Sequence, residues 1–66
     1  MSSRRFGVTL KRLREQTGLT QEVVAKKAGV SRAYLARLEM GRHDPPLSRL
    51  RKLARALSVP VTALLE

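Results

Sequence analysis

Residues 20–39 contain two short helical patterns with only four residues, Ala28 to Ser31, between them. The first pattern follows Thr20 and the second follows Ser31, and both hydroxyl side chains suit an N-cap. Gly29 favours the left-handed backbone that ends a helix, so it predicts where the first pattern stops. A break this short is a tight turn and not a linker. The two helices therefore have to meet at a steep angle.

Apolar residues at helical spacing predict another helix before this pair. Phe6, Leu10 and Leu13 recur at i, i+4 and i+7, so residues 5–16 are predicted to be helical. Gly18 suits the turn that ends this helix. Residues 1–4 precede the pattern, and we expect them to be a flexible basic extension.

Two more helices are predicted after the pair. Pro45 and Pro46 are incompatible with a helix interior, so they predict a loop after Gly41. The fourth helix is marked by Leu47, Leu50, Leu53, Ala54 and Leu57, and a fifth, started by Pro60, has the apolar residues Val61, Leu64 and Leu65. The alternating pattern of a β-strand is absent. The sequence therefore predicts an all-α fold of five short helices in a single domain over residues 1–66.

Basic side chains outnumber acidic ones by fourteen to five, which gives a formal net charge of +9. Solubility alone requires a net charge of magnitude about 2–8, so this excess indicates a polyanionic partner such as nucleic acid or an anionic membrane. The only aromatic residues are Phe6 and Tyr34. The core must then be built from Leu, Val and Ala, and we expect a stability of only a few kcal/mol unless a partner contributes.

Several classes of function lack the residues that they need. The chain has no cysteine, and His43 is its single histidine, so no metal site is predicted. Its five acids are scattered, without paired carboxylates or a triad, and we expect no enzyme activity, cofactor or small-molecule site. No apolar run approaches the ~20 residues of a membrane span. Glycines and prolines interrupt the continuous amphipathic helix that a membrane-surface peptide requires.

The third predicted helix, residues 32–40, has two unlike faces. Leu35 and Leu38, at i and i+3, point inward. The opposite face carries Arg32, Ala33, Ala36 and Arg37. Arginines among small alanines can enter the major groove without steric blockage, and Arg matches the O6/N7 edge of guanine. Together with the turn, the caps and the net charge, this face predicts a helix-turn-helix that binds DNA.

The chain resembles the phage-repressor type of helix-turn-helix domain, the lambda repressor and Cro-like group that is also called XRE-like. The matching stretches are "LKRLRE" at 10–15, "LTQEVVAKKAGVS" at 19–31, "LARLEMGRHDP" at 35–45 and "LRKLARALSVPVTALL" at 50–65. The resemblance implies a five-helix, cytoplasmic, nucleoid-associated regulator of transcription that binds operator DNA, usually as a two-fold dimer. Ala33 departs from the polar residue common at its position, Val24 from a leucine, and Pro46 from a serine cap.

The resemblance also implies roles for individual residues. The base-reading positions correspond to Arg32, Ala33, Ala36 and Arg37. The contacts to the DNA backbone correspond to Gln21, Ser31, Tyr34, Arg42 and His43. A pair that joins the first helix to the third corresponds to Arg14 and Glu39. We expect the surface of a homodimer on the last helix, away from the recognition helix, at Val59, Pro60, Val61 and Leu65.

Each role has a simpler alternative. Arg32 and Arg37 would then be surface charges or contact phosphate without sequence preference, and Tyr34 would lie on its own helix as a partial core residue. Gln21 would be a solvated residue of a first turn. An exposed Arg14–Glu39 pair would be worth only ~0–1 kcal/mol. For the whole chain, the alternative function is a protein-interaction or antitoxin-type module on the same fold, with DNA binding secondary.

Overall fold

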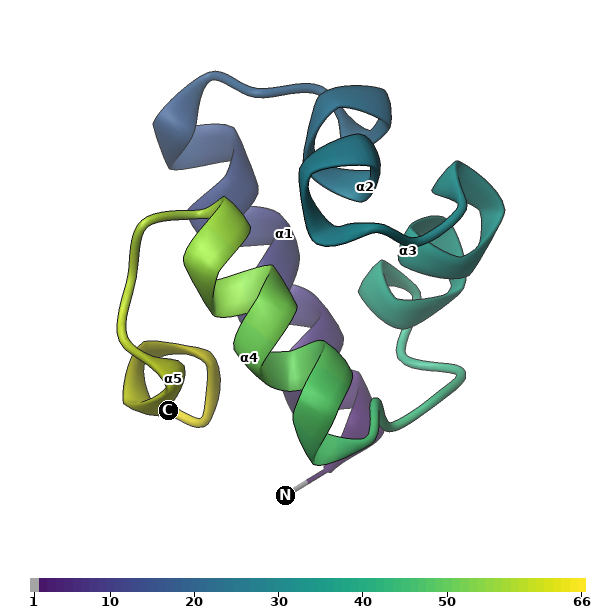
Figure 1. The fold of residues 1–66 in the computed structure, drawn as a ribbon. Helices are drawn as coiled ribbons and strands as arrows, with labels where there is room; N and C mark the ends of the chain where they lie inside the picture. The colour runs from purple at the N-terminus through teal and green to yellow at the C-terminus, as the bar shows by residue number, and fades with distance from the viewer. Residues whose placement is uncertain (1) are drawn as a thin grey trace.

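The computed structural model describes residues 2–66, and five α-helices lie within them. Their bounds are α1 Ser3–Thr17, α2 Gln21–Ala28, α3 Arg32–Glu39, α4 Leu47–Ala56 and α5 Val61–Leu64. In Figure 1, α2 and α3 lie on one side of the molecule and α5 on the other, with α1 and α4 between them. This arrangement confirms the predicted all-α fold. Within residues 2–66, no helix is long and apolar enough to cross a lipid bilayer.

Three hydroxyl side chains cap the N-termini of the first three helices. Thr20 accepts a hydrogen bond from the backbone N–H of Val23, and Ser31 accepts one from Tyr34, as their positions predicted. At the other end of α2, Gly29 adopts a φ of 71°, which an L side chain would disfavour. Residues next to the turn therefore determine the short connection between α2 and α3.

The first helix starts two residues earlier than predicted, at Ser3. Ser2 caps this helix by accepting a hydrogen bond from the Arg5 backbone at 3.2 Å. Residues 2–4 were expected to be flexible; instead they form the N-cap and the first turn of α1, and Met1 lies outside the described residues. Ser3 also donates a hydrogen bond from Oγ to Oδ1 of Asp44 at 2.6 Å, which ties this turn to the loop after α3.

Leucines and small residues build the core around one aromatic ring. The largest fully buried side chains are Phe6, Leu10, Val24, Leu35, Leu38, Leu53 and Leu64. The inward face predicted for α3 is confirmed by the burial of Leu35 and Leu38. Leu47 was wrongly included in the apolar stripe of α4, because 57% of it is exposed. The spacing of apolar residues predicts which side of a helix faces the core, but it does not predict how much of the helix length is packed. Leu47 is the first residue of α4 and lies outside the packed part.

Gly7 allows α1 to lie closer to the end of α3 than a residue with a side chain at this position would permit. A Cβ at this position would lie 2.5 Å from the carbonyl oxygen of Leu38 and 2.8 Å from that of Glu39. Gly41 approaches α1 in the same region, and its Cβ would lie 2.7 Å from Cα of Arg4. The two glycines thus set the position of α3 relative to α1. The sequence pattern gave no indication of this role for Gly7.

Candidate nucleic-acid interface

The connection between α2 and α3 forms a tight turn closed by backbone hydrogen bonds. Val30 donates to the carbonyl oxygen of Ala25 at 3.0 Å, and Gly29 donates to that of Lys26 at 3.2 Å. Ala25 and Ala28 are both buried, so the short side chains on α2 permit close packing against its neighbours. α2 packs against α3 and α4, and α3 also packs against α1. The α2–turn–α3 unit is therefore held from behind by two further helices.

The outer side of α3 carries small and basic side chains. Leu35 and Leu38 are completely buried on its inner side. On the outer side, Arg32, Ala33 and Arg37 are exposed and Ala36 is half-buried. The structure thus places all four predicted base-reading residues on or near the outward face of one helix.

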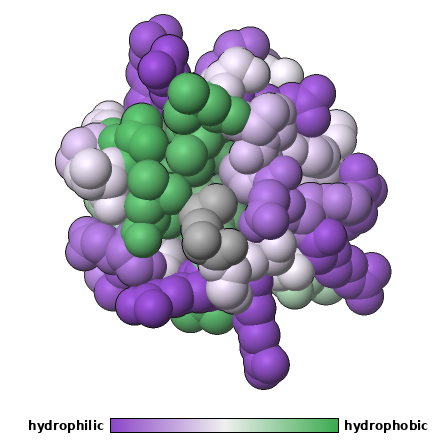
Figure 2. Space-filling view, turned by 90° about the horizontal axis from the view of Figure 1, so that it is seen from below, coloured by the Kyte–Doolittle hydropathy of each residue, from purple (hydrophilic) through white to green (hydrophobic). Residues whose placement is uncertain are grey.

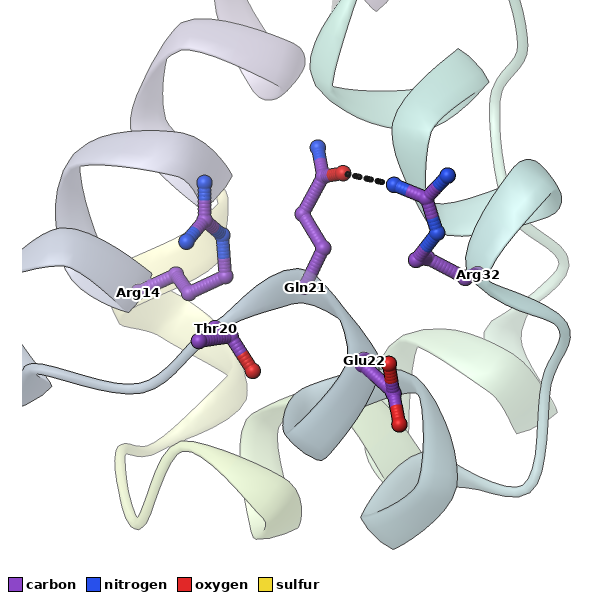
Figure 3. A pocket seen from close by; sticks show the side chains of 5 residues that line it. All are labelled: Arg14, Thr20, Gln21, Glu22 and Arg32. Atoms are coloured by element: carbon purple, nitrogen blue, oxygen red, sulfur yellow. Dashed lines mark hydrogen bonds between the residues drawn. The ribbon is translucent and has the colours of Figure 1, made fainter.

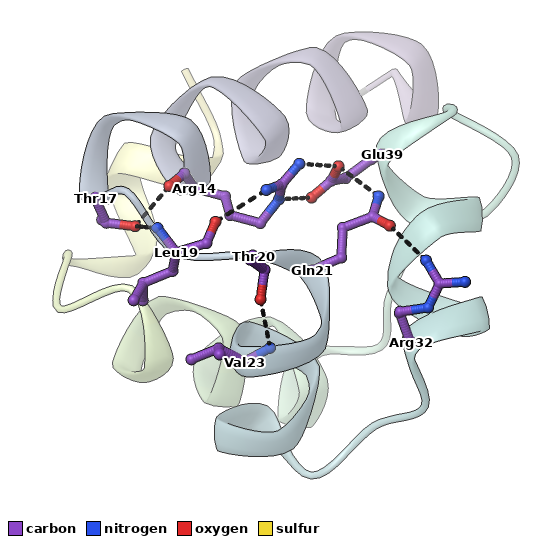
Figure 4. A network of polar contacts seen from close by, with 8 residues as sticks. All are labelled: Arg14, Thr17, Leu19, Thr20, Gln21, Val23, Arg32 and Glu39. Carbon is purple, nitrogen blue, oxygen red and sulfur yellow. Dashed lines mark hydrogen bonds and ion pairs between the residues drawn. The ribbon is translucent and has the colours of Figure 1, made fainter.

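A buried ion pair joins α1 to the C-terminal end of α3 (Figure 4). Arg14 donates from Nε to Oε2 of Glu39 at 2.6 Å and from Nη2 to Oε1 at 3.1 Å. The Arg14 side chain is 12% exposed and that of Glu39 only 3%. The hydrogen bond to Glu39 raises the pKa of Arg14 above its usual value, although burial acts in the opposite direction. Two parallel hydrogen bonds fix the geometry of this pair.

The same carboxylate holds the first residue of α2. Gln21 donates from Nε2 to Oε1 of Glu39 at 3.0 Å, and its own Oε1 accepts a hydrogen bond from Nη1 of Arg32 at 3.4 Å. Figure 4 shows this chain of contacts running from Arg14 in α1 to Arg32 at the start of α3. An exposed arginine of the outward face is therefore connected to the buried ion pair through one amide side chain.

A hollow lies at the N-terminal end of α2 (Figure 3). It has a volume of about 610 Å³ and is lined by Arg14, Thr20, Gln21, Glu22 and Arg32. In Figure 3 the Gln21 amide points toward Arg32, whereas the Glu22 carboxylate points away from both. A helix N-terminus presents backbone N–H groups and a partial positive charge. The hollow therefore combines the N-terminus of α2 with a basic side chain, Arg32, and an acidic one, Glu22.

Tyr34 contacts two other side chains at the surface. It is half-buried, its ring is stacked on His43 with centroids 6.4 Å apart, and Cζ of Arg49 lies 4.7 Å from its ring centroid. Arg49, on α4, is held there by a cation–π interaction. Sequence reasoning missed Arg49, because a basic residue on a predicted helix does not reveal which ring it will meet in space.

The loop after α3 carries the remaining predicted contacts. Arg42 and His43 are both exposed, and the backbone N–H of Arg42 donates to the carbonyl oxygen of Arg37 at 3.1 Å. Gly41 makes this reversal possible with a φ of 76°. The loop thus continues the surface of α3 at its C-terminal end.

The region around α5 leaves apolar side chains at the surface. Pro60 and Leu65 are exposed, while Val59 and Val61 are half-buried. Figure 2 views the molecule from the end where α5 and the two termini lie, and shows apolar side chains gathered on this face. The four predicted dimer residues are therefore at least partly accessible.

Comparison with known sequences gives a consistent result. Residues 5–66 match a family model described as a helix-turn-helix domain. The chain is 43% identical over 58 residues to an immunity repressor protein of Bacillus phage phi105, a match that covers 88% of this chain and 40% of that protein. It is 47% identical over 53 residues to an uncharacterized HTH-type transcriptional regulator, y4dJ, of Sinorhizobium fredii, covering 80% of this chain and 69% of that one.

Solved structures resemble the fold over nearly its whole length. The restriction-modification controller protein C.AhdI from Aeromonas hydrophila superposes with a TM-score of 0.91 at 35% identity, covering 94% of each chain. The clp gene regulator ClgR from C. glutamicum superposes with a TM-score of 0.92 at 29% identity, covering 98% of this chain and 84% of that one. The likeness therefore includes the α2–turn–α3 unit together with the helices that support it.

Proposed function

Because this chain belongs to the helix-turn-helix domain family, as its sequence predicted, we propose that it is a sequence-specific DNA-binding regulator of transcription. In this function α3 enters the major groove of a near-palindromic operator. The observation that carries the proposal is the outward face of α3, where two arginines and two alanines leave room for base edges. Such a protein acts on cytoplasmic, nucleoid-associated DNA.

We assign base reading to the outer side of α3. Arg32 and Arg37 each present a fork of N–H donors that matches O6 and N7 of guanine. Ala33 and Ala36 are small, so they allow close approach and offer apolar contact to a thymine methyl group. Arg32 is oriented in advance by its hydrogen bond to Gln21. Less side-chain freedom is lost on binding when a donor is already held in place.

Contacts to the DNA backbone are assigned to the rim of this face. Gln21 and Ser31 lie at the N-termini of α2 and α3, where backbone N–H groups favour a phosphate. Arg42 and His43 lie on the loop beyond α3, and Tyr34, in contact with His43 and Arg49, contributes its hydroxyl. These contacts set the position of α3 and carry no sequence preference of their own.

The alternative of a protein-interaction module is not favoured. The relatives are described as an immunity repressor and as transcriptional regulators. A module that only binds protein also has no need for two exposed arginines among alanines on an open helix. The phage relative extends well beyond the part that this chain matches, because the match spans 40% of it. Any further activity of such a longer protein is separate from this proposal.

We further propose a homodimer that pairs through the surface at Val59, Pro60, Val61 and Leu65. A single domain of this size makes few base contacts, so two copies on half-sites about 34 Å apart gain specificity. The exposed Leu65 and the half-buried Val59 and Val61 support this arrangement. Sedimentation of the protein with and without its operator tests it, with Leu65→Lys as the disrupted variant. A strict monomer under both conditions would contradict the dimer.

Selection of bound duplexes from a random pool tests the function itself. We expect enrichment of one short sequence with a second, inverted copy about one helical turn away. The matched control is the double variant Arg32→Ala and Arg37→Ala, which removes the proposed readers, and thermal unfolding verifies that it is folded. Enrichment that the double variant reproduces, or no enrichment at all, would exclude sequence-specific reading by α3.

A further inference from the structure

A second group of basic side chains lies beside the α2–α3 turn. Lys26 and Lys27, in the last turn of α2, and Lys52 and Arg55, on α4, line one hollow of about 270 Å³. All four side chains belong to exposed residues. The proposed function does not use them. We refer to these four residues as the α2–α4 basic group.

This group is continuous with the proposed DNA-binding surface. Gly29 lines the hollow of the α2–α4 basic group and also a neighbouring hollow of about 300 Å³ that contains Arg37 and Arg49. Along α4, Arg49, Lys52 and Arg55 follow one another at i, i+3 and i+6, which places them on one side of the helix. Basic side chains of α2, α3 and α4 therefore line two hollows that meet at Gly29.

Within residues 2–66, no ion pair compensates the charges of this group. The ion pair within residues 2–66 is Arg14–Glu39, and neither the lysines nor Arg55 take part in one. The C-terminal end of α2 favours Lys26 and Lys27 through its partial negative charge. That effect does not account for Lys52 and Arg55, which come from a different helix and face the same hollow. Like charges gathered in this way repel unless an anion lies between or over them.

We propose that the α2–α4 basic group binds phosphates of the operator duplex outside the half-site that α3 reads; this inference rests on the proposed function. From Arg49 to Arg55, α4 rises about 9 Å, and phosphates of one DNA strand follow every ~3.4 Å along the duplex axis. The basic side of α4 is therefore long enough to reach more than one phosphate of a strand. DNA flanking the operator would lie along α4 and add affinity without adding sequence preference.

The test compares two lengths of duplex carrying the selected operator. One duplex ends at the operator, and the other extends about one helical turn further on each side. Binding is measured over a series of salt concentrations for the unaltered protein, for the double variant Lys52→Gln and Arg55→Gln, and for Lys26→Gln and Lys27→Gln. The control is Lys11→Gln and Arg12→Gln, which removes the same charge from exposed positions on α1. Thermal unfolding verifies that each variant is folded.

On the extended duplex, log K falls as log salt rises, and each variant of the α2–α4 basic group should make this dependence shallower by about two units per subunit. Each lost phosphate contact reduces the magnitude of the slope by ~0.9. On the short duplex, both should bind like the control. Equal losses on both duplexes, losses no larger than those of the control, or a loss confined to one of the two variant pairs would each overturn the proposal. If the unaltered protein fails to distinguish the operator from a scrambled duplex, the proposed function fails instead.

Discussion

Gln21 donates a hydrogen bond from Nε2 to Oε1 of Glu39 over 3.0 Å and so joins the first residue of α2 to the buried end of α3. Because a carboxylate only accepts, the NH₂ group of this amide must face Glu39. The amide oxygen is then directed outward, where Arg32 donates to it. The buried ion pair thus determines which way an exposed arginine of the proposed interface is held.

The pair between Arg14 and Glu39 should be strongly coupled. Glu39→Gln or Arg14→Met alone should lower the free energy of unfolding by about 3–5 kcal/mol, because each leaves a buried partner without its counter-charge. The double variant should lose much less than the sum of the two. Urea unfolding of the three variants measures this cycle. Additive losses below 1 kcal/mol would mean that the pair contributes no more than an exposed one.

Gln21→Glu should destabilise the fold by about 1–2 kcal/mol. The substitution replaces a donor by an acceptor and places a second carboxylate beside Glu39, so a hydrogen bond is lost and like charges repel. Gln16→Glu, the same change at an exposed position of α1, is the matched control and should have little effect. Unfolding at low and high salt compares the two. Equal stabilities would show that the amide has no defined orientation.

Gly7→Ala should be destabilising by about 1–3 kcal/mol, the usual cost of overpacking. The added methyl group would lie within 3 Å of the backbone of Leu38, Glu39 and Gly41, and backbone atoms cannot rotate away. Gln16→Ala, at an exposed position of the same helix, should be neutral or slightly stabilising. Thermal unfolding distinguishes the two, and a Gly7→Ala protein as stable as the unaltered one would contradict the close approach of α1 and α3.

Ser58→Gly should stabilise the protein. Among residues 2–66, Ser58 is the non-glycine residue with a positive φ, 58°, and it follows Leu57, the C-cap of α4. A left-handed conformation costs an L residue about 1–2 kcal/mol, and the extra freedom of glycine in the unfolded chain offsets about 0.5–1 kcal/mol of that. A net gain of about 0.5–1 kcal/mol is expected. Ser48→Gly, inside α4, should instead lose a similar amount, and a thermal melt of both variants gives the sign.

Arg37 and Arg42 should separate reading from positioning. Arg37→Ala should weaken operator binding by about 1–3 kcal/mol and relax the preference at one base pair per half-site. Arg42→Ala should weaken operator and scrambled duplex alike and reduce the salt slope by about one unit. Titrations against both duplexes at several salt concentrations give the comparison. If Arg37→Ala lost affinity equally on both, Arg37 would contact phosphate only.

Local sequence was sufficient for most of the secondary structure. The hydroxyl caps at Thr20 and Ser31 and the turn at Gly29 depend on side chains within four residues of the atoms that they contact, so their effect can be read along the chain. The start of α1 was placed two residues too late because the prediction followed the apolar pattern and not the cap. Ser2 is a cap of the same kind, but the apolar pattern begins only at Phe6.

The candidate site depends on contacts that no local pattern contains. The contacts of Tyr34 with His43 and Arg49 join α3, the following loop and α4, and the Ser3–Asp44 hydrogen bond joins residues 41 positions apart. The family resemblance implied the Arg14–Glu39 pair, whereas the burial of the pair and its link to Gln21 are evident only in the tertiary structure. Leu47 is excluded from the core because of its position at the start of α4. Whether a residue near the end of a helix is buried depends on how far the neighbouring helices extend.

By itself, the sequence determined the five helices, the tight turn between two of them and the arginines on the outward face of the third. These features follow from spacing, capping and backbone preference, which act over one or two turns of chain. Tertiary structure alone decided how closely α1 and α3 approach at Gly7, and that Gln21 links a buried ion pair to Arg32. It also decided that cations from α2 and α4 share one hollow. Contacts of this kind form only when distant segments are brought together by burial of the common core.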